Sequence, residues 1–488
     1  MATIKKKLLY GGSMSLGGTG RGKNIDKLMD PESVAIFGVS LSDDEKMGNI
    51  IYNNLKNSNR DVFAINPKAE TEEGFYPDIH KVPKDIDLAV LAIPSKYAVE
   101  AVKDCVEFGV GAIILVSGGF SETGDKGKGR EKKIKDILKD SDTRLLGPNT
   151  MGVLLPPVDL DTFFLPEERV ERPGEGGIAF ISQSGFMATP FMETLCEHHT
   201  GLSGFVGIGN RLDIDEVELL EYFANDDDTE VIALYLESMI DGRGFYQIAK
   251  EEAPDTPIIL LKSGRSQVGQ KATQSHTGSL ASTSDRVVKG ISKQAGIINA
   301  HDERELTDFS EALLMNKPIG KGNIAVISSA GGTGVIASDY IEDTDPGIGL
   351  NMPSFSESIK EKLDEVILPI ASSDNPIDLT ANVTDEMVDD VLTILQDEDN
   401  IDGIFMYALF QSPYVGEGMV DSVTKWYHQG EKPIVVACVG DRTGDKWRKK
   451  FYKKGVPAYP STSRAINVLD KLVKRGKFLG YLGDQSNG

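Results

Sequence analysis

Cysteine, histidine, tryptophan and positive charge are all scarce in this chain of 488 residues. It has three cysteines, six histidines and two tryptophans. The cysteines lack metal-ligand spacing, which favours a reducing cytoplasm over a disulfide framework. No stretch reaches the ~18 uninterrupted apolar residues of a membrane span. The 52 Lys and Arg against 75 Asp and Glu give a net charge of −23. That balance argues against a nucleic-acid partner, although small anions need only a few local lysines and helix N-termini.

Short apolar runs alternate with helix-length amphipathic segments along most of the chain. Runs such as VAIFGVS (34–40) and GAIILVSGG (111–119) are apolar throughout, which is typical of parallel strands buried on both faces and joined by crossover helices. A strand, a Ser/Gly turn and a helix restart at residues 176 and 322. We therefore predict an α/β fold of three doubly wound domains with mainly parallel sheets.

The expected boundaries follow from these restarts. The start of the chain is basic and glycine-rich and lacks the apolar region of a signal peptide, so a flexible arm is expected there. The Pro-rich segment 154–177 is expected to be the first linker. The predicted parts are an arm at 1–24, domains at 25–150, 151–300 and 301–475, and a polar tail at 476–488.

The first domain begins with a strand, a glycine turn and a helix, as dinucleotide-binding domains do. Its loop GVSLSDDEKMG lacks the G-x-G-x-x-G spacing of those domains. The next strand ends in Asn66, Pro67 and Lys68, where a nicotinamide site would have Asp or Glu. Lys68, together with Lys46 in the opening loop, suits a ribose phosphate, and coenzyme A carries an ADP head with that extra phosphate. Two solvated lysines are the alternative reading.

The second domain contains a histidine in the polar stretch KATQSHTGSLAS. His276 has hydroxyls and Gly278 around it and no apolar neighbour until Leu280, which indicates a mobile loop that holds something anionic beside a nucleophile. A surface histidine in a polar loop is the alternative. Glu237 ends the apolar run VIALYLE, where a carboxylate can orient an imidazole so that one ring nitrogen attacks phosphorus. A solvated strand-end glutamate would look the same.

An anion site is expected upstream of these two residues. ISQSGFMATPF places Ser182, Gln183, Ser184 and Gly185 at a strand-to-helix junction. Unpaired N–H groups at a helix start favour a phosphoryl group, Ser184 can cap the helix, and Gly185 allows close approach of the backbone. A simple N-cap without a ligand is the alternative.

Several segments resemble a known family. INPK, AIPSKYAVEAV, SGGFSETG and GPNTMGV occur in the order of the CoA-binding domain of NDP-forming acyl-CoA synthetases, which are related to the succinyl-CoA synthetase α subunit. LYLESMIDGR, LLKSGRS and SHTGSLA resemble the second domain of the ADP-forming acetyl-CoA synthetase α subunit. IAVISSAGGTGVIASDY and NPIDLT resemble its third, flavodoxin-like domain. The likeness extends from about residue 25 to residue 475, and it implies a Rossmann-like CoA-binding domain followed by two flavodoxin-like domains.

The resemblance also implies roles for residues. His276 would be phosphorylated with the support of Glu237, beside a phosphate site that includes Gly278. Where that family commonly has Cys after GPN, this chain has Thr150, to which we assign no catalytic duty. The implied CoA groove is lined by Gly38, Ser40, Lys46, Asn66, Pro67, Lys68, Pro94, Ser117 and Asn149.

The sequence has neither a Walker motif nor an ATP-grasp-like region, and no metal site is expected on it. The resemblance therefore implies an ATP-grasp β subunit that binds ADP or ATP with Mg²⁺, in an α₂β₂-type assembly. The third domain has no second histidine or carboxylate pair, and we expect it to pack on the second domain and on the partner.

Three rival functions remain open from the sequence. A succinyl-CoA synthetase α subunit would be shorter, because it lacks the third domain. A non-catalytic CoA-sensing protein would keep the fold, although it would not need His276 and Glu237. A nicotinamide-dependent dehydrogenase would bind NAD tightly. The acyl group, and the choice between ADP and GDP, are not readable from the sequence.

Overall fold

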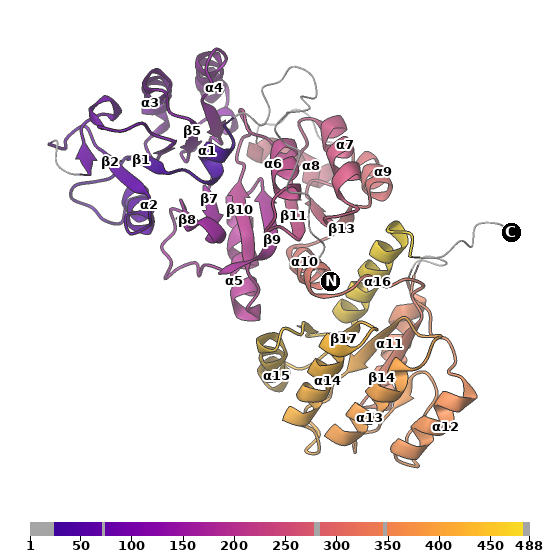
Figure 1. Cartoon of the computed structure of the whole chain (residues 1–488). Coiled ribbons are helices and arrows are strands. Elements are labelled where there is room, and N and C mark those ends of the chain that lie inside the picture. Colours follow the sequence, from indigo (N-terminus) through magenta and orange to yellow (C-terminus); the bar gives the residue numbers. More distant parts are fainter. Residues whose placement is uncertain (1–23, 71–73, 278–283, 345–348, 482–488) are drawn as a thin grey trace. The chain divides into compact units, whose positions relative to one another are not determined.

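The computed structural model describes residues 24–70, 74–277, 284–344 and 349–481. This part of the chain forms three mainly parallel sheets, as predicted, with helices packed against them (Figure 1). It divides into two compact units. One holds the first two sheets and ends at Glu303. The other holds the third sheet, from Arg304 onwards, together with the short segment Glu197–Thr200.

The first sheet has the order β3-β2-β1-β4-β5-β6, and all its strand pairs are parallel. This is the doubly wound order of dinucleotide-binding domains, in which the crevice lies between the first and fourth strands. The strand residues Ser33–Phe37 are buried on both faces, as their apolar run predicts. The elements are β1 Ser33–Phe37, β2 Asp61–Ile65, β3 Phe75–Tyr76, β4 Leu88–Leu91, β5 Ala112–Leu115, β6 Arg144–Leu146, α1 Asp26–Met29, α2 Met47–Leu55, α3 Ser95–Phe108, α4 Asp125–Leu138, η1 Ile79–Lys81 and η2 Ser121–Thr123.

The second sheet has the order β13-β12-β11-β9-β10-β7-β8. Its five parallel strands follow the flavodoxin-like order 2-1-3-4-5, so the crevice is expected between β9 and β11. Phe180, Phe205 and Phe163 pack ring against ring in its core. The elements are β7 Val153–Leu155, β8 Leu160–Asp161, β9 Glu175–Ser182, β10 Leu202–Gly207, β11 Val231–Leu236, β12 Ile258–Lys262, β13 Ile298–Ala300, α5 Ala188–His198, α6 Glu216–Ala224, α7 Gly242–Glu252, α8 Gln267–Thr277, α9 Asp285–Ala295, η3 Pro156–Val158 and η4 Gly185–Met187.

The prediction that 154–177 is a linker was wrong for much of that segment. β7 and β8 form a hairpin that adds to β10 as antiparallel strands, and β9 already begins at Glu175. Two of its four prolines, Pro156 and Pro157, lie in the turn η3 between the two short strands. Proline is tolerated there because a turn makes no demand on its missing N–H.

The third sheet has the order β15-β14-β16-β17-β18, which is again 2-1-3-4-5. Helix starts here carry side-chain caps, such as Thr384, whose hydroxyl accepts a hydrogen bond from Met387 N, and Ser461, which accepts from Arg464 N. The final helix continues to Phe478, into the predicted tail. The elements are β14 Ile324–Ser328, β15 Ile377–Asp378, β16 Gly403–Tyr407, β17 Ile434–Ala437, β18 Ala458–Tyr459, α10 Glu303–Met315, α11 Gly331–Glu342, α12 Glu357–Val366, α13 Asp385–Gln396, α14 Glu417–Gln429, α15 Arg442–Lys453 and α16 Thr462–Phe478.

Buried charges join the first two sheets within their unit. Arg144 of β6 donates to the carboxylates of Asp213 at 2.9 Å and Glu218 at 2.7 Å. Asp213 also accepts from Leu145 N, so it satisfies the backbone at the free edge of the first sheet. Hydrogen bonds to both carboxylates outweigh burial and raise the pKa of Arg144. These contacts join the amino end of β6 in the first sheet to the segment after β10 and to α6 of the second sheet's domain. Among the described residues, no helix is both long and apolar enough to cross a membrane.

Candidate active site

The predicted CoA groove begins at the carboxyl ends of β1 and β4, where the strand order of the first sheet reverses. Gly38 directly follows β1 with a φ of +92°, and a Cβ at this position would overlap the carbonyl oxygen of Ala92 after β4. Only glycine meets both demands without strain. Packing against Ala92 thus requires glycine at the switch point, and the approach of a pyrophosphate to this turn stays a prediction.

Two asparagines hold the loop that follows Gly38. The buried side chain of Asn49 accepts from Ser40 N at 2.6 Å and donates to Ser40 O at 2.9 Å. Asn66 Nδ2 donates to Val39 O at 2.6 Å, while its Oδ1 accepts from Lys68 N at 2.9 Å. Asn66 thus holds the backbone of Val39 and of Lys68 on the two sides of the predicted groove. Asn49 was not predicted, because inside a helix pattern it has the appearance of an ordinary polar residue.

The two lysines expected to meet a ribose phosphate lie on the surface of the same loops. Lys46 is the residue before α2, and its side chain is 57% exposed and 3.9 Å from Asp43. Lys68 and Pro67 follow β2 and are exposed. Both ammonium groups are therefore able to reach a solvent-facing phosphate without a desolvation cost. That role stays a prediction.

The groove continues along the ends of β4, β5 and β6. Pro94 precedes α3, and the Ser117 hydroxyl donates to the carbonyl of Ile93. Asn149 has a φ of +61° and donates through its N–H to Ser117 O at 3.0 Å. Thr150 is buried, and its hydroxyl donates to Gly207 O and accepts from Gly152 N. Thr150 is thus occupied in joining the two sheets.

The second switch point joins the ends of β9 and β11. Ser182 is fully buried and its hydroxyl donates to Ser184 O at 2.6 Å. Gln183 N donates to Tyr235 O at 2.9 Å, and Gln183 Oε1 accepts from the N–H of Glu237 at 2.9 Å. Glu237, the residue after β11, is 7% exposed. The structure thus brings four of the predicted positions, 182–184 and 237, to one edge of this sheet.

The helix start at this edge differs from the prediction in two respects. Ser184 makes no side-chain cap, and the chain enters α5 through the 3₁₀ turn η4. A Cβ at Gly185 would overlap the side chain of Met151, so packing already requires glycine there. The first N–H groups of a helix have no partner within the helix, so an anion site at this turn stays a prediction.

His276 does not lie in a loop as predicted. Its backbone belongs to the last turn of α8, which follows β12 and lies beside η2 of the first sheet. The small polar residues of this segment have no hydrophobic period, so periodicity did not predict the helix. The side chain of His276 and the whole of Gly278 lie outside the described residues.

Two buried cations at this edge were not predicted. Lys262 ends β12 and is 4% exposed, and its Nζ donates to Glu237 O at 2.7 Å. Arg211, with a φ of +56°, donates to Glu216 at 3.0 Å and to both oxygens of Ser238. In the sequence, each is simply a charged residue next to an apolar run. Only the fold reveals that both are buried beside the predicted carboxylate.

Comparison with known proteins places all three sheets in one family. The CoA-binding domain model matches residues 32–156, the succinyl-CoA ligase-like flavodoxin domain 175–313, and the ligase-CoA domain 324–477. The α subunit of acetate–CoA ligase (ADP-forming) I of Pyrococcus furiosus is 32% identical over 466 residues, which is 93% of this chain and 98% of that subunit. This chain belongs to the same family of ADP-forming acyl-CoA ligases.

Other members of the family differ in length. Acetate–CoA ligase (ADP-forming) I of Archaeoglobus fulgidus is 32% identical over 93% of this chain, which spans 64% of that longer protein. The acetyl-coenzyme A synthetase 1 of Ca. Korarchaeum cryptofilum, solved with phosphate and ADP, superposes with a TM-score of 0.84 at 30% identity. The likeness covers 95% of this chain and 99% of that one. The resemblance seen in the sequence is thereby confirmed at the level of family and fold.

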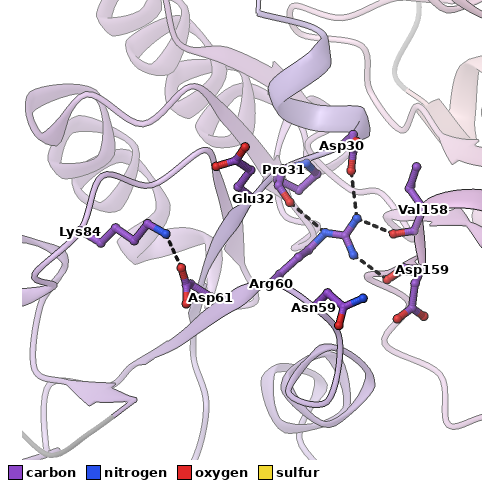
Figure 2. Close-up of a pocket in the computed structure, with 9 residues that line it drawn as sticks. All are labelled: Asp30, Pro31, Glu32, Asn59, Arg60, Asp61, Lys84, Val158 and Asp159. Atoms are coloured by element: carbon purple, nitrogen blue, oxygen red, sulfur yellow. Dashed lines mark hydrogen bonds and ion pairs between the residues drawn. The ribbon is translucent and has the colours of Figure 1, made fainter.

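A separate cavity of about 340 Å³ lies at the opposite, amino edge of the first sheet. Figure 2 shows Arg60 at its centre, donating to the carbonyls of Pro31, Val158 and Asp159 and paired with Asp30. The guanidinium is thus used in tying the β7–β8 hairpin to the first sheet. The cavity lies apart from the switch points of the first and second sheets.

Proposed function

We propose that this chain is the α part of an ADP-forming acyl-CoA synthetase that interconverts acyl-CoA, ADP and phosphate with a carboxylic acid, CoA and ATP. One observation carries the proposal: Ser182, Gln183 and the buried Glu237 lie together at the switch point of the second sheet. His276 belongs to α8, the helix that follows β12 of the same sheet. Family membership supports the reaction class.

The residues of the predicted groove in the first sheet suit the chemistry of CoA. The turn at Gly38 lies at the switch point of the first sheet, where a pyrophosphate is expected to approach the backbone. Lys46 and Lys68 supply positive charge for the ribose phosphate, and Ser40, Pro94, Ser117 and Asn149 line the rest of the path. The predicted groove runs toward Thr150, which joins the first sheet to the end of β10, so we place the thiol end of CoA toward the second sheet.

The chemistry runs in three balanced transfers. Phosphate attacks the thioester carbonyl, the C–S bond breaks, and an acyl phosphate and CoA thiolate result. The imidazole of His276 then attacks phosphorus, and the P–O bond to the acyl group breaks with release of the carboxylate. Finally, the terminal oxygen of ADP attacks phosphorus and the P–N bond breaks. The N–H groups after Ser184 and the residue Gly278 stabilise the phosphoryl charge, and Glu237 orients the imidazole.

The nucleotide step needs a site that this sequence does not show. The sequence has no Walker motif, so we assign ADP and its Mg²⁺ to an ATP-grasp β subunit in an α₂β₂-type cytoplasmic assembly. The names of the Pyrococcus relatives as α subunits agree with a partner. The segment that carries His276 then has to move between the two active sites.

Radiolabelled phosphate tests the proposal. The chain is incubated with its β subunit, labelled phosphate and acetyl-CoA in the absence of ADP. The chain is expected to gain an acid-labile, base-stable label that ADP removes as ATP. His276→Ala should abolish the label while CoA binding is kept. CoA binding without any label in the wild-type complex would instead favour a CoA-sensing protein, and the proposal would be wrong.

A further inference from the structure

The residue pair Glu237-Ser238 forms a turn that three side chains hold from different elements. Gln183 Oε1, after β9, accepts from the N–H groups of both residues, at 2.9 and 3.3 Å. Arg211, after β10, donates to Ser238 O at 2.8 Å and Ser238 Oγ at 2.7 Å. Lys262, at the end of β12, donates to Glu237 O at 2.7 Å. The peptide of Glu237 is thus fixed on both its donor and its acceptor side.

The choice of lysine for this position demands an explanation. Lys262 is 4% exposed, and its ammonium also donates to the carbonyl of Ser263. Burying an ammonium is costly, and a neutral donor would serve a carbonyl equally well. Burial lowers the pKa of Lys262, and the negative charge of Glu237 is the largest influence that raises it again. The two charges therefore act on each other as well as through the backbone.

The other charges that act on Lys262 come from two further elements. Asp285 at the start of α9 favours the ammonium, and Arg211 opposes it. Arg211 is itself paired with the buried carboxylate of Glu216. Glu237 is thus the carboxylate at the switch point whose charge Lys262 balances from the neighbouring strand.

We propose that Lys262 is a positioning residue for phosphoryl transfer: it fixes the main chain of Glu237 and supplies the positive charge that keeps this carboxylate ionised opposite the phosphorylated histidine. The inference rests on the proposed function and deepens it. An ionised carboxylate is the form that accepts the imidazole N–H and so orients the ring. With the cation removed, the carboxylate takes up a proton at higher pH, and the turn that carries it loosens.

The test compares Lys262→Met with Lys262→Arg in the complete complex with the β subunit. The measurement is the single-turnover rate of labelling from phosphate and acetyl-CoA, followed from pH 5 to 8. We expect Lys262→Met to label about 10- to 100-fold more slowly, as misplaced catalytic groups do. Its loss of rate on the acid side should begin at higher pH than in the wild type. Lys262→Arg, which keeps the charge, should restore the acid side of the profile.

Lys432 offers a matched control. Its partly buried ammonium donates to the carbonyls of Leu395, Gln396 and Glu398 at 2.7–2.8 Å, and burial lowers its pKa as well. Lys432→Met removes an equivalent group from the third sheet's unit and should leave the labelling rate and its pH profile unchanged. Thermal unfolding and CoA binding of all variants identify any that fail to fold.

The outcomes separate this inference from the proposed function. Label in the wild type with an unshifted pH profile in folded Lys262→Met would overturn the positioning role alone. A shift of equal size in Lys432→Met would also overturn it, because the effect would then come from general destabilisation. Absence of label in the wild-type complex would count against the proposed function itself.

Discussion

The second and third sheets share one strand order and nearly the same backbone at their switch points. In each, the first strand ends in a serine, Ser182 or Ser328, whose hydroxyl donates to the carbonyl of the residue two positions later. A tyrosine of the neighbouring strand, Tyr235 or Tyr407, lies opposite that serine in the register. The two edges are therefore equivalent as frameworks.

Their side chains differ at the two positions that carry charge. In register, Glu237 of the second sheet corresponds to Leu409 of the third, and Lys262 corresponds to Cys438. Cys438 is buried, and burial raises the pKa of its thiol to about 12. The fold therefore supplies the crevice in both domains, whereas the charged residues Glu237 and Lys262 distinguish the proposed phosphoryl site.

The largest expected effect comes from exchanging one carboxylate at each edge. Glu237→Gln should slow labelling of the chain by about 100-fold or more, because an amide cannot replace the negative charge that orients an imidazolium. Asp378→Asn, at the end of β15 in the third sheet, should change the rate by less than about twofold. Rates are measured in single turnover with the β subunit. A comparable loss in Asp378→Asn would remove the functional contrast between the two edges.

The second contrast concerns the charges that brace the first two sheets. Arg144→Met leaves the carboxylates of Asp213 and Glu218 without their buried partner and should cost about 3–5 kcal/mol of unfolding free energy. Lys132→Ala, which breaks an exposed pair with Asp136, should leave the unfolding free energy almost unchanged.

Two optical probes locate the effect of Arg144→Met. Both tryptophans, Trp426 and Trp447, belong to the unit of the third sheet. In a urea titration, the first-unit part of the far-ultraviolet circular dichroism transition should move to lower urea while the tryptophan fluorescence transition stays in place. If both transitions moved together, the two units would unfold as one, and the contacts of Arg144 would not stabilise the first unit separately.

A third prediction turns from the edge of the second sheet to that of the first. Gly38→Ala forces an alanine into a φ of +92° against Ala92 O, which costs about 1–3 kcal/mol, and CoA affinity should fall correspondingly by about tenfold or more. Gly129→Ala, in an open position of α4, should instead stabilise the chain by about 0.5–1 kcal/mol. Calorimetric titration with CoA measures the affinity of both variants, and urea denaturation measures their unfolding free energies. Unchanged affinity in Gly38→Ala would show that CoA binds elsewhere.

The contrast between the edges also explains how far the sequence could predict this site. Apolar runs identified the strands, and the residue after a parallel strand lies at the carboxyl edge by construction, so Ser182 and Glu237 could be predicted from their positions alone. Lys262 could not, because a lysine that ends a strand is usually solvated. Its burial depends on β11 and α9, which lie beside it only in the folded sheet.

Two further features escaped prediction because local sequence signals were misleading. The helical backbone at His276 lies in a stretch of serine, threonine and glutamine that has no apolar period, so periodicity could not predict it. The β7–β8 hairpin was hidden by prolines that mark a turn as readily as a linker. In both cases the error lay in reading polar or proline-rich sequence as absence of structure.

The smallest expected effect tests whether the position of Cys438, which corresponds to Lys262, is closed to solvent. Cys196 is partly exposed with a pKa raised to about 11, whereas Cys438 is buried with a pKa raised to about 12. A raised pKa leaves less thiolate at neutral pH, and only the thiolate is alkylated. At pH 8, iodoacetamide should therefore modify Cys196 several-fold faster than Cys438, as followed by mass spectrometry of the native chain, and urea should abolish the difference. Early labelling of Cys438 would mean that solvent reaches this position, in which case Cys438 would not be a closed, uncharged counterpart of Lys262.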